Sequence, residues 1–186
     1  MKMMLKQAFK IAMLKSSPTD RIINDPNSIL HSAGIVLLIG MSLTLGLSGV
    51  FNSGFAVDQS WGDLHSRLIA LWIITITTLT GWILWSGSVY LLASKFLGSG
   101  VSFKLIMRAL GICYLPGVLV VFIKTPLNDI MLGPILFSIG MVWILISAVK
   151  INLIVHNIDW IGCVLAIIPG WFLVALIFNL LMSWFG

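Results

Sequence analysis

Acidic side chains are scarce in this chain of 186 residues, which contains no Glu and only six acidic residues, all of them Asp. Charged residues of either sign make up 9%, whereas soluble domains carry about 25%. Hydrophobic residues make up 59%, and the mean hydropathy is +1.09. So little charge cannot cover a water-soluble surface, so the composition excludes a soluble globular protein and places most of the chain in lipid.

Cysteine is also rare. The two cysteines, Cys113 and Cys163, both lie inside apolar runs. Buried cysteine behaves as a small hydrophobic residue, and two such thiols do not form a disulfide framework.

The basic residues outnumber the acidic ones and give a formal net charge of +5. They flank apolar runs instead of forming the continuous stripe of a nucleic-acid-binding face. We therefore expect no nucleic-acid partner and expect anionic lipid headgroups to contact these side chains.

Five apolar runs fill most of the chain, and each is close to the ~20 residues that a helix needs to cross a bilayer. The second run continues in helical register to residue 97 and the fourth to residue 155. The predicted fold is all-α: an N-terminal segment, residues 1–28, followed by a bundle of five transmembrane helices, residues 29–186. The runs are residues 29–51, 68–92, 105–123, 130–149 and 160–185.

Short connections rich in turn-forming residues separate the runs. Gly, Pro, Asn and Asp favour turns because they tolerate or impose non-helical dihedral angles. These connections are residues 52–54, 98–100, 125–129 and 156–159.

The cations divide unequally between the two sides of such a bundle. With five spans, nine of the 11 Lys and Arg residues share the side of the N-terminus, and only Arg67 and Lys124 lie on the other. Positive charge gathers on the cytoplasmic side, so we expect a cytoplasmic N-terminus and an outer C-terminus.

The first 15 residues predict an amphipathic helix lying on the membrane. Lys2, Lys6 and Lys10 recur every four residues and share one helix face, with apolar residues around most of the remainder. This pattern suits a helix in the cytoplasmic headgroup layer. A partly disordered basic tail is the alternative.

Small residues repeat in the fifth and first runs. Gly162, Ala166 and Gly170 are four residues apart, as are Ser42 and Gly46. Such a face lets another helix approach closely. It predicts either a self-association face or packing between helices of the same chain.

Two prolines lie inside apolar runs, and each is followed by glycine. Pro116 and Pro169 each remove a backbone hydrogen bond, which predicts a kink in the third and in the fifth span. Because these spans run in the same direction, the two kinks can face each other and form a binding site. Kinks without a functional role are the alternative.

Catalytic, cofactor and metal-binding patterns are missing. No nucleophile elbow, zinc-protease or phosphate-loop motif occurs. The three histidines, His31, His65 and His156, fall in different connections or span ends, and Lys150 is placed to extend toward headgroups. We therefore expect a non-enzymatic protein without a cofactor or metal.

The stretch of residues 91–121 resembles the central signature of the Yip-domain family. The match comprises a long second span, a Gly-rich turn, a Ser-Phe-Lys step and a third span with Gly-x-x-Tyr-x-Pro. Residues 143–170 add a weaker likeness through Lys150, His156 and Ala166. The matching residues of the central signature are Gly98, Gly100, Ser102, Phe103, Lys104, Gly111, Tyr114, Leu115 and Pro116.

The resemblance implies five spans and a cytoplasmic N-terminus, and it supplies no catalytic residue. Eukaryotic members bind small prenylated GTPases and act in vesicle traffic at the Golgi and endoplasmic reticulum, and they carry a longer N-terminal region. The short N-terminal segment here favours a prokaryotic member, a group mostly without a defined role.

The predicted function is that of a scaffold or accessory subunit in a prokaryotic plasma membrane, associating with other membrane subunits or with itself. One alternative is a channel or permease for a small neutral solute, with Pro116 and Pro169 at its constriction. The other is a GTPase-binding trafficking factor in Golgi or endoplasmic reticulum membranes, if the protein is eukaryotic.

Overall fold

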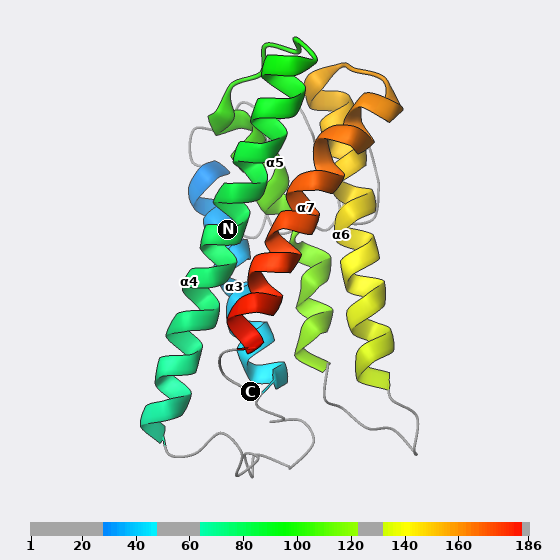
Figure 1. Cartoon of the computed structure of the whole chain (residues 1–186). Helices are drawn as coiled ribbons and strands as arrows, with labels where there is room; N and C mark the ends of the chain where they lie inside the picture. Colours follow the sequence, from blue (N-terminus) through cyan, green and yellow to red (C-terminus); the bar gives the residue numbers. More distant parts are fainter. Residues whose placement is uncertain (1–27, 48–63, 123–131, 184–186) are drawn as a thin grey trace.

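A computed structural model describes residues 28–47, 64–122 and 132–183, and this part of the chain is helical without strands (Figure 1). Five segments are long and apolar enough to cross a membrane, which confirms the predicted number and is compatible with a multi-pass membrane protein. The N-terminal segment with Lys2, Lys6 and Lys10 lies outside the described residues, as do the connections at 52–54 and 125–129. The elements are α3 (Ser28–Leu47), α4 (Leu64–Val89), η2 (Tyr90–Phe96), α5 (Phe103–Cys113), η3 (Leu115–Phe122), α6 (Leu132–His156) and α7 (Trp160–Ser183).

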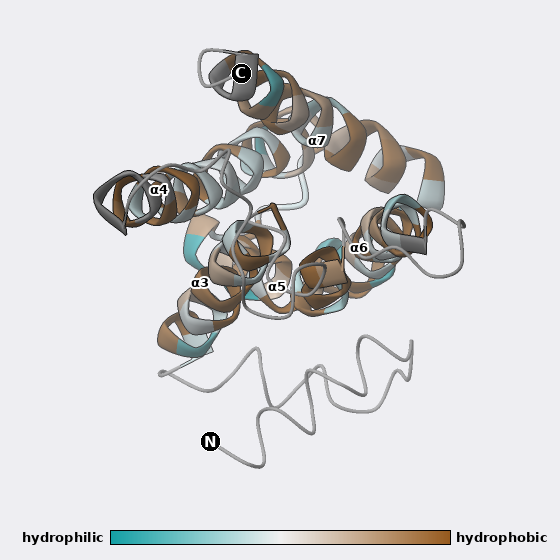
Figure 2. Cartoon of the chain, turned by 90° about the horizontal axis from the view of Figure 1, so that it is seen from below, coloured by the Kyte–Doolittle hydropathy of each residue, from teal (hydrophilic) through white to brown (hydrophobic). Residues whose placement is uncertain are grey.

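The helices form two rows. Viewed along the bundle, α3, α5 and α6 lie side by side, and α4 and α7 lie across from them (Figure 2). The third span, α5 with η3, contacts α3 on one side and α6 on the other, and α4 also packs against α5. This central position explains why the third span has the largest buried share of the five.

The second span ends in a π-helix and a glycine turn. Within η2 the backbone hydrogen bonds reach back five residues, as in the 3.0 Å bond from the Leu97 N–H to the Leu92 carbonyl. Gly98 and Gly100 then adopt φ angles of +72° and +68°, which only glycine adopts without strain. The chain thereby reverses into α5, where the Ser102 hydroxyl accepts a hydrogen bond from the Leu105 N–H.

The third span changes helix type at its proline. The α-helix α5 ends at Cys113, and the 3₁₀-helix η3 begins at Leu115. Pro116 has no N–H to continue the α-helical ladder, and the Gly117 N–H instead bonds the Tyr114 carbonyl at 2.7 Å, three residues back. The distortion expected at Pro116 therefore takes the form of a tighter helix.

Three side-chain hydrogen bonds, one buried and two partly buried, join neighbouring spans. The Ser32 hydroxyl donates to the Arg108 carbonyl at 2.8 Å and links α3 to α5. The Trp82 indole donates to the Met107 carbonyl at 3.1 Å, and the Trp85 indole to the Ile167 carbonyl at 3.0 Å, which link α4 to α5 and to α7. Each bond satisfies a polar group that would otherwise lie unpaired in an apolar interior.

Most other polar side chains within the spans are paired inside their own helix. A hydroxyl or amide donates to the backbone carbonyl four residues earlier, so little unpaired polarity is presented to the bilayer. Side chains bonded in this way are Ser42, Thr44, Thr78, Ser86, Ser138, Asn152 and Asn179.

Candidate functional site

An apolar cavity of about 320 Å³ lies between the two rows of helices, away from the glycine turn. All five spans contribute to its lining, which includes Ile39 of α3, Gly81 of α4, Gly117 of η3, Ile144 of α6 and Trp171 of α7. No lining residue carries a charge. A space of this kind holds apolar molecules and excludes water.

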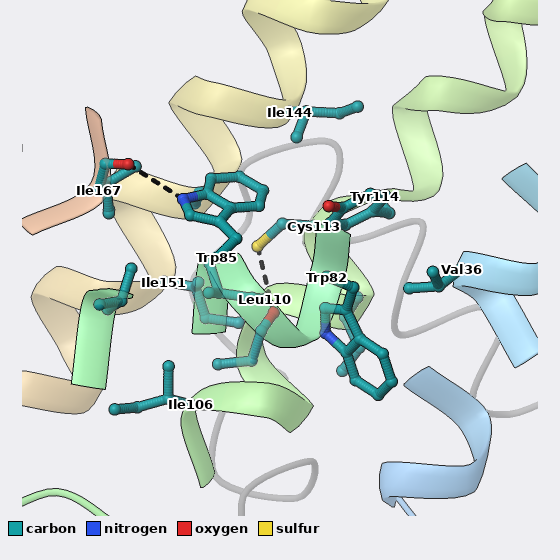
Figure 3. Close-up of a cluster of buried hydrophobic side chains, with 14 of the residues drawn as sticks. Val36, Trp82, Trp85, Ile106, Leu110, Cys113, Tyr114, Ile144, Ile151 and Ile167 are labelled. Atoms are coloured by element: carbon teal, nitrogen blue, oxygen red, sulfur yellow. Dashed lines mark hydrogen bonds between the residues drawn. The ribbon is translucent and has the colours of Figure 1, made fainter. Parts of the chain in front are cut away.

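Two aromatic rings, those of Trp85 and Tyr114, lie next to each other in the cavity lining. Their centroids are 5.7 Å apart and their planes meet at 62°, the edge-to-face arrangement that aromatic pairs favour. Trp85 is 1% exposed, and its indole is directed toward Ile167 (Figure 3). Tyr114 is 8% exposed, and no hydrogen bond joins its hydroxyl to another residue of the described ranges.

A second feature, the Ser–His cluster, joins the glycine turn to the end of α6. The cluster consists of Ser94, Ser99 and His156. The Ser99 hydroxyl lies 2.6 Å from Nδ1 of His156 and 3.4 Å from the Ser94 hydroxyl, which in turn donates to the Val101 carbonyl at 2.8 Å. The cluster therefore ties together the η2–α5 and α6–α7 connections.

Two buried polar atoms on α6 lie beside this cluster without a hydrogen-bond partner among the described residues. They are Nε2 of His156 and Oδ1 of Asn152, which are four residues apart on the same helix face. Both residues are almost fully buried. Because the Ser99 hydroxyl donates to Ser94, it accepts from the Nδ1–H of His156, which leaves Nε2 as an acceptor. Oδ1 of Asn152 is also an acceptor, so a single water molecule that donates both its hydrogens can serve both atoms.

Sequence reasoning placed His156 in a connection and did not single out Asn152 or Ser99. The signal was present, because Asn152 and His156 are polar residues with the i, i+4 spacing at the end of an apolar run. The spacing can be interpreted only with the structure, which shows that α6 continues to His156.

The small-residue face of α7 is covered by helices of the same chain. A Cβ atom added at Gly170 would lie 2.7 Å from Trp85 Cδ1 and 2.8 Å from Ser88 Cβ of α4, and one added at Gly162 would lie 3.3 Å from Leu97 Cδ1. Ala166 is 1% exposed. This geometry matches the second of the two interpretations, packing within the bundle, and leaves the face unavailable for self-association.

The corresponding pair in α3 is also internal. A Cβ atom at Gly46 would collide with the Val120 carbonyl oxygen of η3, and Ser42 is buried with its hydroxyl on the Leu38 carbonyl. Gly46 therefore lets the first and third spans approach closely.

The two prolines have different surroundings. Pro116 is buried, and its carbonyl lies against α6 near Gly140. Pro169 is exposed and lies within a continuous α7. Neither lines the cavity, and a joint binding site at the two prolines stays a prediction.

Both cysteines are free and buried, and Cys113 donates to the Ala109 carbonyl within its own helix (Figure 3). Over residues 28–47, 64–122 and 132–183 no group of three or more His, Cys, Asp or Glu side chains is placed to hold a metal ion.

No family model, curated protein or solved structure matches this chain. The likeness to the Yip-domain family stays a prediction.

Proposed function

We propose that this protein is a non-enzymatic scaffold or accessory subunit in the plasma membrane of a prokaryote, with its N-terminus in the cytoplasm and its C-terminus outside. Five apolar helices and the excess of cations on one side support this placement. In this arrangement Lys2, Lys6 and Lys10 contact anionic headgroups. The Yip-like signature at residues 91–121 agrees with the same topology.

The observation that carries the proposal is Asn179, an exposed amide on the outer half of α7. Its Nδ2 atom donates to the Ala175 carbonyl of the same helix at 2.8 Å, which leaves Oδ1 available as an acceptor. Amide side chains in membrane helices bind neighbouring helices because hydrocarbon offers no other hydrogen-bond partner.

Asn179 lies on a continuous exposed stripe of α7. Three large apolar residues precede it at helical spacing, and each is at least 57% exposed. They are Leu165, Phe172 and Leu176. These four residues, the exposed α7 stripe, lie on the side opposite Ala166 and Gly170. We expect one transmembrane helix of a partner subunit to pack on this stripe, with a side-chain donor at the level of Asn179.

The pore alternative has weaker support. Transport of a neutral polar solute needs polar groups along its path, whereas the cavity is lined almost wholly by apolar side chains. The cavity therefore supports binding within the bilayer better than passage across it.

Extraction in mild detergent, followed by native gel electrophoresis and mass spectrometry, tests the proposal. The unmodified chain should migrate with a partner in fixed ratio. Asn179→Leu, which keeps the branched side-chain shape but removes the amide, should weaken that association about three- to thirtyfold. Ser138→Ala is the matched control, because Ser138 is an exposed polar residue of α6 that bonds its own helix.

Migration of the unmodified chain by itself contradicts the accessory role and makes solute flux in liposomes the next measurement. Migration as a homo-oligomer that Asn179→Leu dissociates assigns the stripe to a second copy of this chain.

A further inference from the structure

We propose that the apolar cavity binds a neutral, membrane-soluble molecule with a hydrocarbon chain and one carbonyl oxygen, which accepts a hydrogen bond from the Tyr114 hydroxyl. The chemical class is a long-chain ester or ketone. The proposal concerns the interior of a single chain, and the cavity borders the exposed α7 stripe at Asn179, which lines it.

The size of the cavity selects a chain-like occupant. Its volume of about 320 Å³ is roughly twice that of an engineered apolar cavity that holds benzene, and it lies at the lower end of the range for ligand pockets. A transmembrane helix is about 10–12 Å across and fills this volume in less than one turn. A partner helix therefore does not fit, whereas one hydrocarbon chain does.

The electrostatics of the cavity select a neutral occupant. No Lys, Arg, His, Asp or Glu lines it, so a carboxylate or an ammonium group entering from water would lose its hydration without gaining a counter-ion. Free fatty acids in their charged form and phosphate headgroups are excluded from the interior on this ground.

Tyr114 supplies a buried polar contact in a lining whose other hydroxyl and amide side chains, Thr77, Thr78, Thr80 and Asn179, are more exposed. Its side chain lines the cavity and is more than nine-tenths buried, and its hydroxyl, which is not among the fully enclosed unpaired polar atoms of the described residues, stays accessible to a molecule in the cavity. A buried donor without an acceptor is unfavourable, and an apolar cavity offers no stable water to satisfy it. A ligand oxygen at this point removes the deficit, which favours a carbonyl compound over a plain hydrocarbon.

Trp85 is a built-in reporter of occupancy. It lines the cavity beside Tyr114, yet it is only 1% exposed, so lipid chains around the bundle do not reach it. Trp82 lies three residues earlier on α4 and is 3% exposed, but it does not line the cavity. Figure 3 shows the two indoles directed to different sides of the helix. The pair therefore separates entry into the cavity from general contact with lipid.

The test uses the purified full chain in phosphatidylcholine vesicles and two brominated probes, which quench tryptophan fluorescence on contact. One probe is a dibrominated fatty acid methyl ester, and the other is a dibrominated alkane of equal chain length without oxygen. The ester should quench a saturable component with an affinity about three- to tenfold higher than that of the alkane, the effect of one net hydrogen bond.

Three variants locate that component. Trp85→Phe combined with Trp171→Phe should remove it, because both indoles line the cavity, Trp82→Phe should leave it intact, and Tyr114→Phe should lower the affinity for the ester to that of the alkane. Equal affinities of the unmodified chain for the two probes overturn the role of Tyr114. A saturable component that survives the combined Trp85→Phe and Trp171→Phe replacement overturns occupancy of the cavity.

Two further measurements keep the proposal testable if an aromatic variant fails to fold. Native mass spectrometry of the unmodified chain should show one bound methyl ester. Ala175→Phe, which adds a ring to the cavity lining from α7, should abolish that adduct while helical circular dichroism is retained. Undiminished binding to Ala175→Phe overturns the assignment of the site to this cavity.

Discussion

At the scale of single residues, close helix packing depends on a few glycines with different surroundings. Gly170 faces Trp85 and Ser88 of α4, whereas Gly87 has no atom within 4 Å of the position where its Cβ would be. The spacing of Gly162, Ala166 and Gly170 predicted a close helix contact from sequence alone. Which helix makes the contact depends on how the spans are ordered in space, and the spacing carries no such information.

We expect Gly170→Leu to destabilise the bundle by about 1–3 kcal/mol, because a larger side chain must displace the Trp85 ring or separate α7 from α4. Thermal unfolding in detergent, followed by circular dichroism, measures the change. Gly87→Leu is the matched control and should cause no loss. Equal stability of Gly170→Leu and the unmodified chain would contradict the packing described for α7.

At the scale of elements, the two connections at the basic end of the bundle act as one unit. The turn that contains Gly98 and Gly100 and the connection that follows His156 meet through the Ser–His cluster. Sequence patterns located both turns, because glycine and asparagine mark reversals of the chain. They could not show that Ser99 and His156 meet, since 57 residues separate them in sequence.

A double-mutant cycle tests this coupling. Ser99→Ala and His156→Phe should each destabilise the bundle, because each leaves a buried polar group or its partner unpaired. The double variant should lose less than the sum, with a coupling energy of about 0.5–3 kcal/mol. Additive losses would mean that the contact does not join the two connections in solution.

In the third span, the sequence predicts where the helix is irregular but not which form the irregularity takes. Pro116 predicted an irregularity, and the structure places one there. Its form, a 3₁₀-helix from Leu115 to Phe122, depends on the packing of η3 against α3 and α6, where Gly46 and Gly140 admit its backbone. A proline alone does not determine this outcome.

At the scale of the whole molecule, the number of spans follows from hydropathy because the bilayer fixes the length of a crossing helix. The arrangement of the spans in two rows and the cavity between them do not follow, since lipid-facing and cavity-facing apolar residues look alike in sequence. The sequence shows that Tyr114 and Trp85 are aromatic residues within apolar runs. It does not show that their rings lie next to each other.

The proposed orientation has a direct consequence. A reporter enzyme that is active only outside the cytoplasm, fused after Gly186, should be active, and the same reporter fused in the connection at residues 98–100 should be inactive. The nine cations on one side are the physical cause. The reverse pattern of activity would contradict the charge argument.

The N-terminal segment should bind anionic membranes through its lysine face. Replacing Lys2, Lys6 and Lys10 together by Gln should weaken binding of the N-terminal peptide to phosphatidylserine vesicles by ~1 kcal/mol per charge. Neutral vesicles are the control, and the difference should shrink as salt rises. Unchanged binding to the anionic vesicles would contradict an interfacial helix.

The π-helix η2 accommodates one extra residue and so keeps the residues that follow it oriented toward α6. A π turn holds about one residue more than an α turn, which corresponds to an insertion of a single residue into the helix. Deleting the exposed Leu91 should let the segment close as an ordinary α-helix, with little change in helical content, and the following residues should keep nearly their present orientation because the π turn already absorbs the extra residue. Ser99 would then still face His156, whereas deletion of one residue from the regular part of α4 would turn Ser99 away by roughly 100°, so the contact between two distant connections depends on the number of residues in α4.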